Sequence, residues 1–299
     1  MNRSDRDFGN FEATDAASED SAASDPQVSL SVVIPARDEE FELPRTLASV
    51  AAAMDACDAQ LASSEVIVVD DGSTDRTAAI ARDAGATVVA VELHNIGQVR
   101  NAGAAAATGE AIVFLDADTR LPPETLRAAL EQIAGGAIGG GAGCRWDQPP
   151  PLAARISSTL FLFGWQTVAK WAAGCFIYCR RDAFEAVGGF DPQWLAAEER
   201  WLSRALKQEG KRRGRPWVML RESVVSSARK LRMFGTLDLV RVAAPVLLLP
   251  GGLFGSGSRL KSARGLEFFY DAPRETADAT PATPPANETS RRPADGSGG

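Results

Sequence analysis

AIVFLDADT, residues 111–119, is an apolar run that stops abruptly at two carboxylates, Asp116 and Asp118. It lies between Gly109 and Pro122-Pro123, and its length and composition predict a strand buried on both faces of a parallel sheet. Open α/β sheets bind ligands at the carboxyl ends of their strands, and carboxylates there suit Mg²⁺ or Mn²⁺ shared with a phosphate. A second interpretation is that the aspartates only turn the chain and cap the following helix.

Composition indicates an ordinary α/β core. The 299 residues are 45% hydrophobic and 24% charged. Much of the net charge of −7 comes from residues 1–27, which hold seven acids against two arginines. The remaining core is about neutral, so we expect no nucleic-acid partner. The four cysteines form no CxxC pair, and neither a leader pattern nor a spanning apolar run is present, so we expect a reduced, cytoplasmic setting.

Strand and helix patterns alternate along the chain from Val28 onward. Apolar runs at 28–36, 65–70 and 86–92 predict three strands before residues 111–115, each followed by helical sequence. Such alternation predicts an α/β fold with a mostly parallel, Rossmann-like central sheet flanked by helices. The glycine-rich stretch 134–150 predicts an edge strand and a mobile loop.

The flanking segments differ in composition from this core. Residues 1–27 and 273–299 are predicted to be disordered tails, because they hold few large apolar residues. Between them we expect one catalytic domain over 28–235 and an apolar helical extension over 236–272. The apolar stretch 239–254 is too short to cross a bilayer, and it suits peripheral contact with the inner face of a membrane, a second subunit, or the core itself.

Acidic residues follow three of the predicted strands, at 38–40, at Asp70-Asp71 and at Asp116/Asp118. In a parallel sheet these positions share one edge. An Asx-turn or helix cap at DDGSTD accounts for at least one of Asp70 and Asp71, and recognition of a nucleobase or ribose is the competing explanation. The fingerprint GxGxxG follows none of these strands, which argues against NAD or FAD. His94, the only histidine, is assigned no catalytic role.

Several motifs in order resemble those of the family 2 glycosyltransferases of the GT-A fold. They cover about residues 28–230: SVVIPARDEE, VIVVDDGSTDRT, GQVRNAGAAAATGE, FLDADT and GGFDPQWLAAEERWLSRALKQEG. The resemblance implies a nucleotide-diphosphate sugar donor, an acceptor of unknown kind, a divalent metal (Mg²⁺ or Mn²⁺) at the Asp-x-Asp motif, and an inverting transfer. It assigns metal binding to Asp116 and Asp118, and donor binding to Pro35, Arg37, Glu39, Asp70, Asp71, Arg100, Asp116 and Arg229.

The general base that inversion requires is expected in LAAEERWLSRAL. Glu198 and Glu199 stand at the start of a predicted helix, where acids also favour the helix dipole. Many relatives have Glu-Asp here and use the second acid, so the resemblance gives the role to Glu199. The Glu-Glu pair of this chain leaves Glu198 as the alternative.

Two other functions are weighed against a transferase. IVFLDADT also matches the Asp-x-Asp-x-Thr of haloacid-dehalogenase-like phosphatases, but three βα units precede it and no Asp-Asp pair follows it. The non-enzymatic alternative is a GT-A-like scaffold that binds a nucleotide without catalysis. The acids present at every expected motif argue against it.

Overall fold

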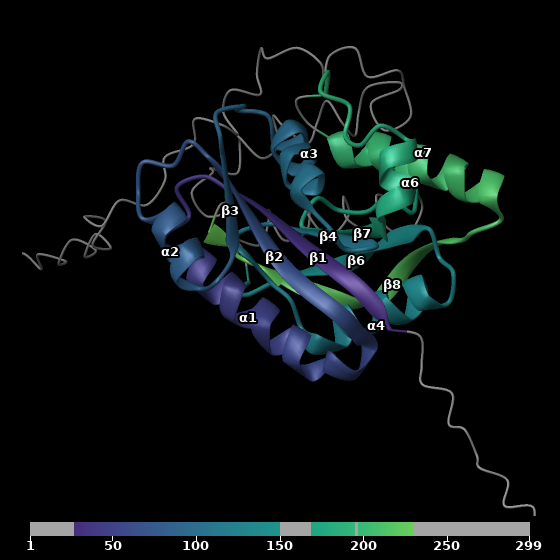
Figure 1. Ribbon diagram of the computed structural model, residues 1–299, viewed down its shortest axis with the longest axis horizontal. Helices are drawn as coiled ribbons and strands as arrows, with labels where there is room; N and C mark the ends of the chain where they lie inside the picture. Colours follow the sequence, from purple (N-terminus) through teal and green to yellow (C-terminus); the bar gives the residue numbers. More distant parts are fainter. Residues whose placement is uncertain (1–26, 150–168, 195–196, 230–299) are drawn as a thin grey trace, which may run out of the picture.

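The computed structural model describes residues 27–149, 169–194 and 197–229, which form a sheet with helices on both faces (Figure 1). The strands are β1 Val28–Ala36, β2 Leu61–Asp71, β3 Thr87–Val91, β4 Ala111–Leu115, β5 Thr119–Arg120, β6 Gly139–Trp146, β7 Phe176–Arg180 and β8 Trp217–Ser226. The helices are α1 Leu43–Ala56, α2 Thr77–Asp83, α3 Ile96–Ala106, α4 Pro123–Ala134, α6 Arg181–Ala186 and α7 Glu198–Arg213, with a 3-10 turn at Asp58–Gln60.

The first half of the sheet is parallel, as the alternating pattern predicts. Within the described residues the strand order is β3-β2-β1-β4-β7-β6-β8-β5, and β1 pairs in parallel with both β2 and β4. β2 also pairs in parallel with β3. The carboxyl ends of these four strands therefore meet at one edge, where the predicted site residues follow them.

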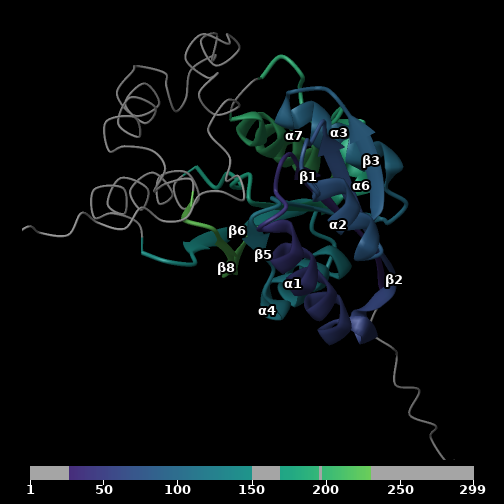
Figure 2. The ribbon, with the colours of Figure 1, turned by 90° about the vertical axis from the view of Figure 1, so that its left-hand side faces the viewer.

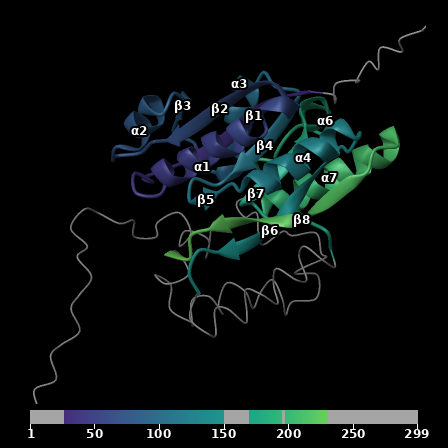
Figure 3. The same cartoon turned by 90° about the horizontal axis from the view of Figure 1, so that it is seen from below.

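The second half is mixed, and it corrects the prediction of an edge strand in the glycine-rich stretch. β6 lies inside the sheet, antiparallel to β7 and parallel to β8, which runs beside it (Figure 3). A Cβ atom at Gly140 would lie 1.6 Å from the carbonyl oxygen of Val218, and one at Gly141 would lie 2.6 Å from the Cβ of Ala172. These glycines are present because neighbouring backbone approaches too closely for side chains, and not because the strand is loose.

Two apolar layers cover the two faces of the sheet. Alternate residues of β4 point to opposite sides, so that Val113 joins the layer under α1 and α4 while Phe114 joins the layer under α3, α6 and α7. Figure 2 shows these two groups of helices on opposite sides of the strands. The Phe114 ring packs 5.2 Å, centroid to centroid, from each of the rings of Phe184 and Phe190. This packing fixes the strand that carries the Asp-x-Asp motif.

Several predictions fall on residues outside the described ranges. These are the tails 1–27 (apart from Gln27) and 273–299, the apolar segment 236–272, and the membrane contact through 239–254. Among the helices that are described, none has the length and apolar character needed to cross a bilayer. All four cysteines are free thiols, and three of them are buried.

Candidate functional site

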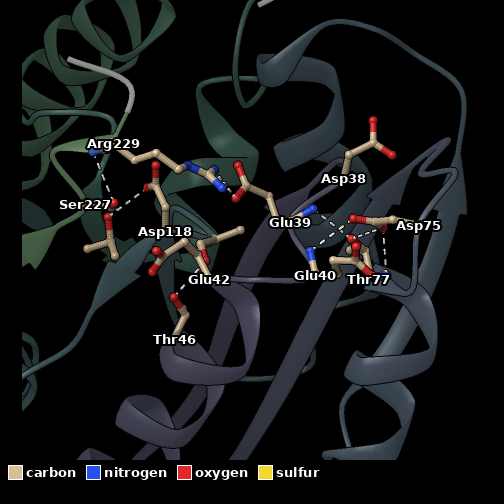
Figure 4. A network of polar contacts seen from close by, with 12 residues as sticks. Asp38, Glu39, Glu40, Glu42, Thr46, Asp75, Thr77, Asp118, Ser227 and Arg229 are labelled. Atoms are coloured by element: carbon tan, nitrogen blue, oxygen red, sulfur yellow. Dashed lines mark hydrogen bonds and ion pairs between the residues drawn. The ribbon is translucent and has the colours of Figure 1, made fainter. Parts of the chain in front are cut away.

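The predicted donor-binding residues gather where β1, β2 and β4 end. Arg37 and Glu39 follow β1, and Pro35 is buried within that strand opposite Val69 of β2. The acids that follow or end the neighbouring strands are Asp70, Asp71, Asp116 and Asp118. Figure 4 shows part of this edge, with Glu39 and Asp118 on adjoining loops. The sheet thus brings together residues that lie far apart in the sequence.

The Asp-x-Asp turn is held firmly by its surroundings. The hydroxyl of Thr46 on α1 donates to the carbonyl of the residue between the two aspartates at 2.7 Å, and the amide of Ser227 donates to the Asp118 carbonyl at 3.0 Å. The Asp118 residue is 7% exposed, and the Asp116 side chain is 32% exposed. Helix α4 has Pro122 at its N-cap and no side-chain cap, so neither aspartate serves as the cap that the alternative interpretation requires.

Asp70 and Asp71 are adjacent but have different surroundings. The Asp71 carboxylate accepts from the amide of Leu93 at 2.6 Å and from the amide of His94 at 3.0 Å, so it holds the turn between β3 and α3. Asp70 is 8% exposed, and its Oδ1 has no hydrogen-bond partner among the described residues. A buried acceptor without a partner carries a desolvation cost, and a ligand that donates to it would offset that cost.

His94 lies among the donor-side residues, although the sequence assigns it no role. Its Nδ1 is 2.7 Å from Nη1 of Arg37 and 3.8 Å from Oδ2 of Asp71, and its side chain is 55% exposed. Its φ angle of 49° is in the left-handed region, where the two Asp71 contacts hold the turn. The signal available in the sequence is its place directly after the third predicted strand, at the sheet edge that carries the acids.

The loop after β1 is hydrogen-bonded to the segment that follows β2. Oδ1 of Asp38 accepts from the amide of Thr74 at 2.7 Å, and the amide of Glu39 donates to the hydroxyl of Thr77 at 2.8 Å. The guanidinium of Arg229 reaches across to the Glu39 carboxylate at 2.7 Å, as Figure 4 shows. Two residues predicted to bind the donor are therefore paired with each other, and this pair joins the end of β8 to the end of β1.

Arg100 links the Asp-x-Asp turn to the glutamate pair. It extends from α3, is 2% exposed, and donates to Oδ1 of Asp116 at 2.9 Å and to Oε1 of Glu198 at 2.5 Å. Burial opposes the charge on Arg100, but the carboxylate of Asp116 and then that of Glu198 outweigh it and raise the pKa of Arg100. The cation therefore stays charged between two carboxylates from separate parts of the fold.

Glu198 and Glu199 begin α7, as predicted, but they differ in access. The Glu198 side chain is 6% exposed and is held by Arg100, whereas Glu199 is half-buried. Burial raises the pKa of Glu199 well above its usual value, and the neighbouring Glu198 carboxylate raises that pKa further. A carboxylate with a raised pKa is the stronger base at neutral pH.

The acids at this edge suit a metal ion that a substrate also binds. In the described part of the chain, no three His, Cys, Asp or Glu residues converge tightly enough to form a metal cage. Asp116 and Asp118 supply two hard carboxylates at the end of one strand. Mg²⁺ is commonly held by one or two carboxylates together with substrate phosphates, and this donor set fits that arrangement.

The mixed sheet, with acids at the edge of its parallel half and helices on both faces, has the GT-A glycosyltransferase fold. A mannosyltransferase from Pyrobaculum calidifontis, solved with GDP-Man and Mn²⁺, shares it with a TM-score of 0.54 at 20% identity, over 74% of this chain and 62% of that one. S. aureus TarS 1-349, solved with UDP-GlcNAc, shares it with a TM-score of 0.51 at 19% identity, over 82% and 73%. At these identities the likeness shows the fold alone.

The family follows from the sequence match. The protein-family model described as Glycosyl transferase family 2 matches residues 31–188, which is more than half of the chain. The chain therefore belongs to this family. An undecaprenyl-phosphate 4-deoxy-4-formamido-L-arabinose transferase from Aeromonas hydrophila subsp. hydrophila is 41% identical over 109 residues, 34% of this chain and 32% of the relative. A 4,4'-diaponeurosporenoate glycosyltransferase from Staphylococcus haemolyticus is 39% identical over 114 residues, 36% and 28%. The match spans about a third of the length of these relatives.

Proposed function

We propose that the chain is an inverting, metal-dependent glycosyltransferase that moves a sugar from a nucleotide-diphosphate donor to an acceptor hydroxyl. The observation that carries this proposal is the junction of two acidic centres at one sheet edge. Asp116 and Asp118 form the first centre, and Glu198 and Glu199 form the second, which is bonded to the first through Arg100. A single-displacement transfer needs both a charge-stabilised leaving group and a base.

The nucleotide would bind over the ends of β1 and β2. Asp70 is the acid that we assign to the nucleobase, because its Oδ1 lacks a partner among the described residues and can accept from a ring N–H. Asp71 supports this position indirectly by fixing the turn at Leu93 and His94. Arg37 contributes a cation on the same side, and its contact with His94 sets where that charge lies.

The diphosphate would lie at Asp116 and Asp118, which would hold the cation. A bound divalent cation supplies positive charge for the leaving diphosphate. The hydrogen bonds from Thr46 and Ser227 to the Asp-x-Asp turn keep the two carboxylates in place, so little reorganisation accompanies the reaction. Arg229 lies nearby through its pairing with Glu39 and is assigned to the same phosphates.

Glu199 would take the proton from the acceptor hydroxyl. Its raised pKa, caused by burial and then by Glu198, matches the requirement for a base near neutral pH. The Glu198 carboxylate is already engaged with the guanidinium of Arg100, so we assign the base to its neighbour Glu199. Between the two glutamates that the sequence leaves open, we therefore propose Glu199 as the base and Glu198 as the partner of Arg100.

The acceptor is proposed to be lipid-linked. Two relatives are named for undecaprenyl phosphate and 4,4'-diaponeurosporenoate, and the sequence of this chain carries an apolar stretch at 239–254. Contact of that stretch with the inner face of a membrane would bring the site to such an acceptor. Transfer to a lipid extract that partitions into organic solvent would support this class, and transfer only to water-soluble glycans would refute it.

A thermal-shift experiment on the full chain tests the donor proposal. UDP-GlcNAc and GDP-Man are each added with and without Mn²⁺. A ligand at about a hundred times its Kd adds roughly 2.7 kcal/mol to the free energy of unfolding, so at least one donor should raise the Tm by about 5 °C in the presence of Mn²⁺. No shift with either nucleotide, in either condition, contradicts the proposal.

Turnover separates an enzyme from a nucleotide-binding scaffold. Release of UDP or GDP from a donor that binds is followed in wild type and in E199Q. General bases contribute about 10²- to 10⁴-fold, so E199Q should bind the donor normally and lose at least a hundredfold in kcat. Donor binding without any release by the wild-type chain favours the scaffold.

A further inference from the structure

The guanidinium of Arg100 is buried and forms a fork, in which its two terminal nitrogens contact the Asp-x-Asp turn and the glutamate pair at the start of α7. Nη1 donates to Glu198, and Nη2 donates both to Asp116 and to the carbonyl of Gly174 at 3.1 Å. Its side chain is 3% exposed, and the ring of Phe190 lies 5.4 Å from its Cζ. Both terminal nitrogens are therefore engaged by the protein itself.

This arrangement requires an arginine at position 100. Its two terminal nitrogens point along different directions of one rigid plane, so one side chain reaches a carboxylate after β4 and another at the start of α7. A lysine ammonium is a single point charge on a flexible stem and cannot hold both at fixed directions. The backbone leaves room for the fork, since a Cβ at Gly174 would lie 3.2 Å from Nη2.

The start of α7 is placed by the same contacts. Ala197, the residue before Glu198, has a φ angle of 57°, which a non-glycine residue adopts only when its surroundings hold it there. A Cβ at Gly97 would lie 3.5 Å from Cγ of Glu198, so α3 approaches this glutamate closely. Glu198 is thus fixed from α3 by both Gly97 and Arg100, and Glu199 follows it in the chain.

We infer that Arg100 is a positioning residue, which holds the Asp-x-Asp turn and the glutamate pair at a set separation, and that Glu198 is its anchor. This inference rests on the proposed function and differs from the donor-binding role that the sequence resemblance assigns to Arg100. On this inference the fork holds the start of α7, and with it the proposed base Glu199, at a set distance from the Asp-x-Asp turn, where the leaving diphosphate would lie. The expected signature is a loss of kcat with unchanged nucleotide affinity.

The experiment pairs R100K with a matched control, R213K, in the full chain. Arg213 also joins two carboxylates from different elements, Asp182 at 2.6 Å and Glu209 at 2.6 Å. It lies at the other end of α7, roughly 20 Å along the helix from Glu198. R213K therefore reports the cost of losing a bridging arginine, 27% exposed, at the end of α7 away from the site.

A second pair of variants tests whether the function of Glu198 depends on its hydrogen bond to Arg100 or on its negative charge. E198Q keeps the length of the side chain and an oxygen that accepts from Arg100, whereas E198D keeps the charge but withdraws the carboxylate by one methylene. Nucleotide release is measured with UDP-GlcNAc and GDP-Man in Mn²⁺, and the affinity for UDP or GDP is measured by calorimetry. Circular dichroism melts check that each variant is folded.

The inference predicts that R100K loses about tenfold or more in kcat while its nucleotide Kd stays within about twofold and R213K matches wild type. It also predicts that E198D loses more kcat than E198Q, and this comparison stands even when R100K does not fold. Weaker UDP or GDP binding by R100K, in proportion to its lost activity, identifies a donor contact and overturns the inference. E198Q as inactive as E199Q makes Glu198 a base and also overturns it. Absence of binding and release in wild type refutes the proposed function itself.

Discussion

Replacement of Asp71 should lower the stability of the fold, whereas replacement of its neighbour Asp70 should weaken nucleotide binding and leave the stability nearly unchanged. Asp71 accepts hydrogen bonds from two backbone amides, those of Leu93 and His94. Hydrogen bonds to a charged group contribute about 1.5–3 kcal/mol each, so D71A should lower the free energy of unfolding by about 3 kcal/mol or more. In a domain of 150–250 residues this corresponds to a fall in Tm of roughly 6–12 °C.

The matched variant D70A removes an oxygen that has no hydrogen-bond partner among the described residues. Its free energy of unfolding should therefore stay within about 0.5 kcal/mol of wild type or rise slightly. Its affinity for UDP or GDP should fall about tenfold or more, which calorimetry measures alongside urea unfolding of both variants. Equal destabilisation by D70A and D71A, or a stable D71A, would refute the assignment of the two acids.

Three further outcomes follow from the geometry. Because burial and then Glu198 raise the pKa of Glu199, the acid limb of kcat against pH should lie above the usual glutamate range, and E198Q should move it to lower pH. G140A should be insoluble or strongly destabilised in a urea titration, since its Cβ would lie 1.6 Å from a carbonyl oxygen of β8. T46V removes the hydroxyl that holds the Asp-x-Asp turn and leaves the buried Ala117 carbonyl without that donor, so it should raise the Mn²⁺ concentration needed for half-maximal nucleotide binding severalfold and lower the free energy of unfolding by about 1–3 kcal/mol.

The sequence predicts the parallel half of the fold well, for a physical reason. Strands buried on both faces are continuous apolar runs, and the strand at 111–115 is bounded by Gly109 and the two aspartates, so its limits are visible. The edge that gathers Asp70 and Asp116 then follows from parallel pairing alone. The start of α7 at Glu198 is likewise predicted.

The second half of the sheet is not predictable from local patterns. The glycines at 139–141 indicate a loose edge strand, yet they lie inside the sheet because of side chains and backbone far away in the sequence. The two-residue strand β5 is too short to carry a pattern, and it pairs with β8. The antiparallel direction of β7 depends on a chain reversal that apolar periodicity does not encode.

The partners of single side chains are also beyond the sequence. Arg100 lies 98 residues from Glu198 in the chain, and only the packing of α3 against the start of α7 reveals their contact. His94 is similar, since its ring meets Arg37 across 57 residues. The motifs identify which residues matter, and the fold determines whether each meets a ligand or another side chain.

Above all, we propose that the end of β4 binds a nucleotide diphosphate together with a divalent cation. Calorimetric titration of UDP and of GDP into the full chain, with and without Mn²⁺, measures this directly in wild type and in D118A. We expect Mn²⁺ to strengthen nucleotide binding at least tenfold in wild type and to leave nucleotide binding unchanged in D118A. Wild-type binding that is indifferent to Mn²⁺, or an equal response to Mn²⁺ in D118A, would contradict it.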